Sequence, residues 1–131
     1  MKEPVLDEFG KILLEVLLLK VCDQETSQDP EGWTPENPLW GHCAVVSLVV
    51  QGIFGGDLLR ASLDGTPFAK MRSHYWNRLP DGREVDFTRA QFGESGPGEL
   101  KAEVRTREYV LSYAPTVQRH ELLLERLGEL W

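Results

Sequence analysis

Cys43 has the clearest potential for chemistry, because it stands where a polar loop meets an apolar segment. We expect that segment, residues 44–54, to form a buried helix. Free backbone N–H groups and the positive end of the helix dipole stabilise a thiolate at a helix start, and the N–H of Cys43 could stabilise a developing oxyanion. The alternative is a small apolar core residue, a common setting for a free cysteine. Taken alone, this residue favours the structural interpretation.

A predicted β-hairpin carries the two other candidate residues. Residues 68–79 and 83–88 have strand character and are separated by the turn sequence Pro80-Asp81-Gly82. A three-residue turn pairs Leu79 with Arg83 and fixes the register of both strands. A turn of four residues would shift this register and point the side chains of the second strand to the opposite face.

With the three-residue turn, His74, Trp76, Asp86 and Thr88 share one face of the hairpin. His74 and Asp86 are then diagonal neighbours, roughly 7–8 Å apart at Cα, and their side chains can meet. A carboxylate that holds one imidazole nitrogen leaves the other free to act as a base. The structural alternatives are a polar strand residue for His74 and a turn cap for Asp86. Together with Cys43, the pattern predicts a nucleophile, a base and an orienting acid.

The elements that must position these residues follow the order helix, long loop, helix, strands, helix. Apolar residues recur at helical spacing over residues 5–21, with Pro4 suited to the first turn. We interpret this segment as a core-packing helix, because its acidic polar face disfavours a membrane-surface role. Residues 23–38 are a polar, proline-rich loop, residues 57–63 a strand, and residues 117–130 an amphipathic helix that starts near Pro115.

Two segments leave the type of element open. Residues 44–54 are rich in valine, which favours a strand, but their length and the following Gly55-Gly56 favour a helix. Residues 101–112 contain β-formers and could hold a strand or a short helix. The order predicts one α+β domain over residues 1–131, in which a buried helix bearing Cys43 packs on a small antiparallel sheet between N- and C-terminal helices.

The composition of the chain makes some binding partners and cellular locations less favourable than others. The formal net charge of -7 disfavours nonspecific binding to nucleic acid or an anionic membrane. The N-terminal region lacks the features of a secretory signal, and no apolar run approaches the ~18 residues of a membrane span. We therefore expect a cytoplasmic protein with reduced thiols, in which Cys22 is structural.

The motifs around the three candidate residues resemble those of known protein families, including enzymes with a catalytic cysteine. His74-Tyr75-Trp76, Asp81-Gly82 and Asp86-Phe87-Thr88 resemble the transglutaminase core, in which a His-x-Trp strand turns at a glycine and returns to Asp-x-Thr. The stretch from residue 33 to residue 92 more closely resembles the bacterial YunG-like family, with these matching motifs: Trp33 to Trp40, Gly41-His42-Cys43, Gly55-Gly56, His74 to Asn77, Asp81-Gly82, Val85 to Thr88 and Gln91-Phe92. The resemblance implies a papain/transglutaminase-like fold with Cys43, His74 and Asp86 as a catalytic triad, and it implies no particular substrate.

The chain also departs from the papain pattern. Papain has a tryptophan directly after its cysteine, where this chain has Ala44, and its third triad member is an asparagine, where this chain has Asp86. Asn37 lies six residues before the cysteine, at the spacing of papain's oxyanion-hole glutamine. It is therefore a candidate oxyanion donor, and otherwise a turn residue beside Pro38.

Three aromatic or imidazole side chains near the site have two interpretations each. Trp40 and Trp76 could wall a substrate groove or pack in the core. His42 could polarise the site, but we interpret it as a surface histidine. These alternatives depend on burial, which the sequence does not give.

Three functions compete. The first is a thiol enzyme without a cofactor, in which Cys43 attacks the carbonyl of a peptide, amide or other acyl substrate and the acyl-enzyme passes to water or an amine. The second is a noncatalytic module of the same fold that binds a peptide or small ligand. The third is a metal site of Cys43, His42, His74 and Asp86, which is disfavoured because adjacent residues cannot easily both ligate one zinc and no Cys-x-x-Cys or His-Glu-x-x-His spacing occurs.

Overall fold

A four-stranded antiparallel sheet, with strands in the order β3-β2-β1-β4, forms one layer of the fold. The computed structural model describes residues 5–94 and 96–130. In chain order the elements are α1 (Glu8–Val21), α2 (Cys43–Phe54), β1 (Asp57–Ser62), a 3₁₀ turn (Ala69–Met71), β2 (Ser73–Arg78), β3 (Glu84–Val85), a second 3₁₀ turn (Arg89–Phe92), β4 (Glu103–Arg105), α3 (Arg107–Val110) and α4 (Ala114–Gly128). The predicted α+β class is confirmed.

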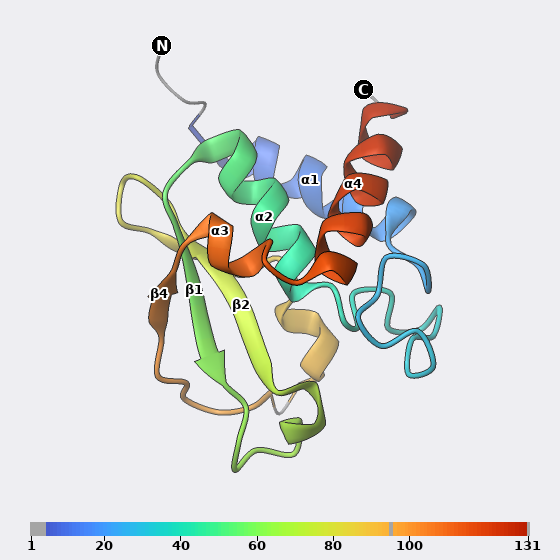
Figure 1. Ribbon diagram of the computed structural model, residues 1–131. Helices are drawn as coiled ribbons and strands as arrows, with labels where there is room; N and C mark the ends of the chain where they lie inside the picture. Colours follow the sequence, from blue (N-terminus) through green and yellow to red (C-terminus); the bar gives the residue numbers. More distant parts are fainter. Residues whose placement is uncertain (1–4, 95, 131) are drawn as a thin grey trace.

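Helix α2 occupies the centre of the molecule, between the sheet and the helices α1 and α4 (Figure 1). Seven of its twelve residues are buried, which explains why tertiary packing overrides the strand preference of its valines. Asn77 of β2 donates a side-chain hydrogen bond of 3.0 Å to the carbonyl of Ser47 in α2. The predicted buried helix on a small antiparallel sheet is therefore present.

Helix α1 begins later than the apolar pattern predicts. Asp7 caps it by accepting a 2.7 Å hydrogen bond from the Gly10 N–H, so residues 5–7 precede the helix. Pro4, predicted for the first turn, lies outside the described residues. The helix buries Leu14, Leu17, Leu18 and Val21, whereas Phe9 is 76% exposed and Ile12 is 53% exposed. The predicted core-packing helix is therefore present, and it packs through one face while its other apolar residues are exposed.

The hairpin has the predicted three-residue turn. The Leu79 N–H donates to the Arg83 carbonyl over 2.7 Å, and Arg78 is paired with Glu84. The second strand is shorter than predicted, because β3 ends at Val85 and Asp86 begins the turn that follows. The register predicted for the hairpin is correct, but the ladder stops one residue before the candidate acid.

Strand β2 also starts later than predicted, at Ser73. Thr66 organises the preceding turns, because its hydroxyl donates to the Leu63 carbonyl and accepts from the Phe68 N–H. Arg72 has a φ of 68°, which lies outside the β region of regular strands. Residues 68–72 therefore form a compact turn in place of the first part of the predicted strand.

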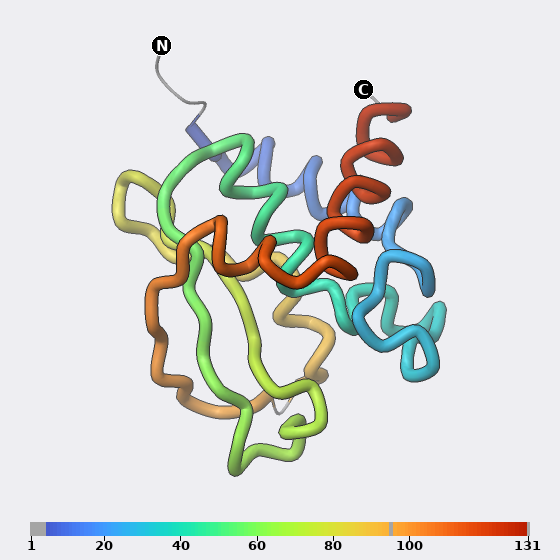
Figure 2. The backbone as a smooth tube through the Cα atoms, in the orientation of Figure 1, coloured from blue at the N-terminus to red at the C-terminus, as the bar shows by residue number. Residues whose placement is uncertain are grey.

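The remaining segments agree closely with their predictions. The loop of residues 23–42 stays on the side of the molecule opposite to β4 (Figure 2). The ambiguous segment 101–112 contains both a strand, β4, and a short helix, α3. Helix α4 has Pro115 in its first turn, as predicted. Among the described residues, no helix is both long and apolar enough to cross a membrane.

Candidate active site

Cys43 is the first residue of α2, and His42 precedes it as the N-cap residue. The cysteine is 4% exposed, and its Sγ lies 3.9 Å from the carbonyl oxygen of Ser73, at the start of β2. The first N–H groups of a helix have no partner within the helix, and they bear a partial positive charge. The thiol therefore lies where the backbone favours negative charge, against the strand that carries His74.

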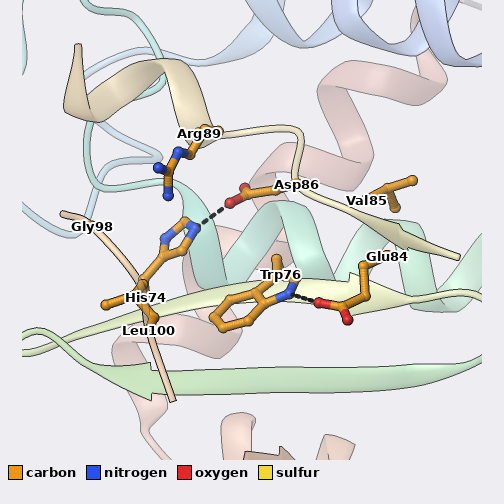
Figure 3. Close-up of a pocket in the computed structure, with 8 residues that line it drawn as sticks. All are labelled: His74, Trp76, Glu84, Val85, Asp86, Arg89, Gly98 and Leu100. Atoms are coloured by element: carbon orange, nitrogen blue, oxygen red, sulfur yellow. Dashed lines mark hydrogen bonds and ion pairs between the residues drawn. The ribbon is translucent and has the colours of Figure 1, made fainter. Parts of the chain in front are cut away.

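His74 and Asp86 are joined by a short hydrogen bond. The Nε2 atom of His74 lies 2.6 Å from Oδ2 of Asp86. Figure 3 marks this hydrogen bond with a dashed line. The other carboxylate oxygen of Asp86 accepts a 3.2 Å hydrogen bond from the Thr88 N–H. Asp86 therefore both caps the turn around Thr88 and holds the imidazole through a hydrogen bond. The turn cap and the histidine partner, considered as alternatives for Asp86, are compatible.

The electrostatic environment of His74 favours its charged form. Burial of the imidazole disfavours the charge, but the hydrogen bond to Asp86 and the adjacent Cys43 thiol outweigh it and raise the pKa of His74 to about 9. Nδ1 is buried and forms no hydrogen bond of ordinary geometry within the described residues, although Cys43 lies close enough to influence the ring. At neutral pH His74 is therefore protonated beside the sulfur, with Nε2 committed to Asp86.

A cavity of about 300 Å³ opens on the Asp86 side of the imidazole. Its walls are formed by the following residues: His74, Trp76, Glu84, Val85, Asp86, Arg89, Gly98 and Leu100. Trp76 stacks on His74 with 5.6 Å between ring centroids and donates from Nε1 to Glu84. Trp76 thus lines a cavity at the candidate site, and its contact with a substrate stays a prediction.

Trp40 has a different setting. Its ring packs against Phe68 at a centroid distance of 6.5 Å, and its Nε1 donates to Asp29 over 3.0 Å. It belongs to a small apolar cluster around Leu63, Met71 and Phe92. The structure therefore places Trp40 in the packing of this cluster, and Trp40 does not line the cavity beside His74.

The segment before Cys43 is held by Gln91, a residue for which the sequence analysis assigned no role. Its Oε1 accepts a 3.0 Å hydrogen bond from the Gly41 N–H, and its backbone carbonyl accepts one of 2.9 Å from Asn37 Nδ2. Asn37 therefore has one amide N–H committed to the fold. Gln91 is 3% exposed, and its Nε2 has no partner in the described part of the chain. Its place in the Gln-Phe motif was the available sequence signal.

His42 is fully buried, so its interpretation as a surface histidine was wrong. Nδ1 lies 2.9 Å from the Trp40 carbonyl, and Nε2 lies 2.6 Å from the Thr26 hydroxyl. Burial lowers the pKa of His42 to about 4, so the ring is neutral and donates to Trp40. The residue stabilises the loop that delivers Cys43 to the helix start.

The second cysteine is chemically distinct from the first. Cys22 is buried and not disulfide-bonded, and burial raises its pKa to about 12. Among the described residues, no group of three or more His, Cys, Asp or Glu side chains is arranged to hold a metal ion.

The fold and the site define an α+β protein in which a cysteine at a helix start faces a carboxylate-bound histidine on a strand. The sequence model of the family described as YunG protein matches residues 11–130, and the chain belongs to this family. It is also similar to the "Uncharacterized protein YunG" of Bacillus subtilis (strain 168), with 37% identity over 60 residues. That alignment covers 46% of this chain and 46% of the relative, about half of each. No solved structure matches the chain.

Proposed function

We propose that the protein is a thiol hydrolase or acyl transferase whose Cys43, His74 and Asp86 act as in papain and transglutaminases. One observation carries the proposal: a buried imidazole is bound through Nε2 to Asp86 and lies beside the Cys43 sulfur at a helix start. A protonated imidazole next to a cysteine stabilises the thiolate, which is the nucleophilic form. The class of substrate is a peptide, amide or other acyl compound.

The proposed reaction divides into two steps. The Cys43 thiolate adds to the carbonyl carbon, and His74 donates its proton to the leaving amine as the C–N bond breaks and a thioester forms. In the second step water or an acceptor amine attacks the thioester while neutral His74 takes its proton. The C–S bond breaks and releases the Cys43 thiolate, which restores the thiolate-imidazolium pair. Asp86 stabilises the imidazolium at each stage.

Three groups are proposed to complete the site. The backbone N–H of Cys43, in the first turn of α2, is a donor for the oxyanion that develops on the carbonyl. Asn37 has a second amide N–H beyond the one bound to Gln91, so it remains a candidate for the same task. Trp76, in the cavity wall, is proposed to contact the substrate.

One observation favours the noncatalytic alternative. Cys43 is 4% exposed and is absent from the walls of the cavities described around it, so a substrate reaches the sulfur only after a local movement. A binding module that keeps the fold would need no such movement. Reactivity of the thiol distinguishes the two functions.

The proposal is tested by the pH dependence of alkylation by iodoacetamide. We expect Cys43 to react quickly below pH 7 and His74→Ala to slow the reaction at pH 6.5 by about tenfold or more, since the imidazolium partner is lost. A Cys43→Ser variant measures the background from Cys22, whose raised pKa keeps it slow. Equal rates in the wild type and His74→Ala would support the binding module instead.

A panel of acyl electrophiles then tests acyl transfer itself. Mass spectrometry of the intact protein should show one acyl adduct on Cys43 in the wild type and none in Cys43→Ser. Adduct loss in water, compared with loss in the presence of a primary amine, separates hydrolysis from transfer. A stable adduct that neither acceptor removes would contradict turnover.

A further inference from the structure

A second cavity, of about 270 Å³, lies where the sheet meets α3 and α4. It differs in charge from the cavity beside Asp86. Three arginines line it, and no aspartate or glutamate does. The remaining walls carry tyrosine, serine, threonine and glutamine side chains, together with Ala44 and Val110. The whole sequence carries a net charge of -7, so the charge of this basic cavity is opposite in sign to that of the molecule as a whole.

The three arginines come from different elements. Arg60 lies on β1 beside its cross-strand partner Tyr75, Arg72 directly precedes β2, and Arg119 lies on α4. None of the three forms an ion pair within residues 5–94 and 96–130. By contrast, Arg78 and Arg126 are each paired with an aspartate.

Arg119 has a hydrogen-bond donor that no acceptor satisfies in the described residues. One of its terminal nitrogens donates to the Thr116 hydroxyl over 3.3 Å, but its Nε is buried without a partner in the described residues. Burial of a guanidinium without a full set of acceptors is unfavourable. An anionic oxygen group in the cavity would supply these acceptors and reduce the repulsion among the arginines.

This cavity adjoins the nucleophile. Ala44, which follows Cys43 in α2, lines it, and so does Ser73, whose carbonyl oxygen lies 3.9 Å from the Cys43 sulfur. Tyr113 and Cys43 are close enough to act on the pKa of Arg119, which burial lowers. A ligand group bound here is therefore next to the reacting sulfur, in a cavity that Asp86 does not line.

We propose that this arginine cavity binds a carboxylate or phosphate group of the molecule that reacts at Cys43, so that the substrate is an anionic acyl compound. The reaction at Cys43 rests on the proposed function, whereas anion binding by the cavity does not. Arg60, Arg72 and Arg119 hold the anionic group while the acyl carbon faces the sulfur.

The charge preference is tested with two alkylating reagents that differ in charge. Iodoacetate is anionic and iodoacetamide is neutral, so the ratio of their rates at Cys43 reports the attraction of anions to this site. We expect the ratio to fall by about threefold to tenfold in Arg72→Gln and in Arg60→Gln. The exposed Lys101→Gln removes the same charge outside the cavity and should leave the ratio unchanged. An unchanged ratio in both arginine variants would overturn the proposal.

A direct binding experiment separates this inference from the proposed function. In Cys43→Ser protein, titration with inorganic phosphate and with succinate is followed by amide NMR shifts. Saturable shifts at Ser73, Ser112 and Thr116 are expected, and the reagent with the lower apparent Kd identifies phosphate or carboxylate as the favoured group. The Arg60→Gln/Arg72→Gln double variant, with its fold checked by circular dichroism, should lose saturation.

Failure of the proposed thiol enzyme and failure of the proposed anion site give different results. If neither alkylating reagent modifies Cys43 but both anions bind through the arginines, the thiol enzyme is excluded and the anion site stands. If Cys43 is reactive but neither anion gives a saturable shift in Cys43→Ser, the arginine cavity is not an anion site and the proposed function stands.

Discussion

At the scale of single residues, Asp86 links the fold to the proposed chemistry. Its Oδ1 accepts from the Thr88 N–H, which fixes the turn after β3, and its Oδ2 holds Nε2 of His74. Because both oxygens are used, the carboxylate has little freedom to rotate. The imidazole is therefore held in one orientation, which is the condition for the proton transfers of the proposed reaction.

The charge of Asp86 should control the protonation of His74. In Asp86→Asn we expect the pKa of His74 to fall from about 9 toward or below 6.5, because burial then acts with only Cys43 opposing it. NMR titration of the imidazole carbons measures this change. Asp81→Asn is the matched control, since Asp81 is paired with Arg83 at the hairpin turn and should leave His74 unchanged. An unaltered pKa in Asp86→Asn would contradict the electrostatic role assigned to Asp86.

At the scale of elements, the junction between α2 and β1 sets the position of the buried helix against the sheet. Gly56 has a φ of 85°, and a Cβ there would lie 2.1 Å from the backbone carbonyl oxygen of Arg78, at the end of β2. Only glycine permits both this conformation and this close approach. The Gly55-Gly56 pair therefore ends the helix and also allows close contact between backbones.

Gly56→Ala should be strongly destabilising for both reasons. We expect its free energy of unfolding to fall by at least about 2 kcal/mol more than that of Gly65→Ala. Gly65 also has a positive φ, of 80°, but a Cβ at that position meets nothing within 4 Å. Urea unfolding of the two variants gives the comparison. Equal losses would mean that backbone conformation alone matters and that the contact with Arg78 relaxes freely.

At the scale of the whole molecule, two buried histidines give stability opposite dependences on pH. His42 has a pKa lowered to about 4, so its contribution is present above pH 6.5 and is lost as pH falls toward 4. His74 has a pKa raised to about 9, so its contribution is present below pH 6.5 and is lost as pH rises through 9. Together they favour greatest stability near pH 6.5.

His42→Gln tests the acid side of this profile. We expect a loss of about 1–3 kcal/mol at pH 7, because Trp40 and Thr26 lose a well-placed partner. We also expect the further loss between pH 6.5 and pH 4 to shrink by roughly 2–3 kcal/mol, because the group that must take up a proton is gone. Denaturant midpoints measured across this pH range provide the test. The same acid dependence in both proteins would show that other groups cause it.

The local features were predictable from the sequence. The turn Pro80-Asp81-Gly82 fixed the register that brings His74 near Asp86, and the polar-to-apolar change at Cys43 marked the start of α2. The resemblance of residues 33–92 to the YunG-like family was confirmed by the family match, whereas the papain/transglutaminase-like fold stays a prediction. Each of these depends on neighbours in the chain or across one hairpin, where turn chemistry and periodicity decide the structure.

Burial and contacts between distant segments depended on the tertiary structure. The sequence did not show that His42 would be enclosed by Thr26 and Trp40, or that the apolar residues of α1 would lie on both faces of the helix. It also did not bring Arg60, Arg72 and Arg119 into one cavity. The sequence by itself determined the candidate nucleophile, base and acid, because local pattern fixes their elements. Their surroundings were decided by packing among helices and strands far apart in the chain, which sets burial, charge and access together.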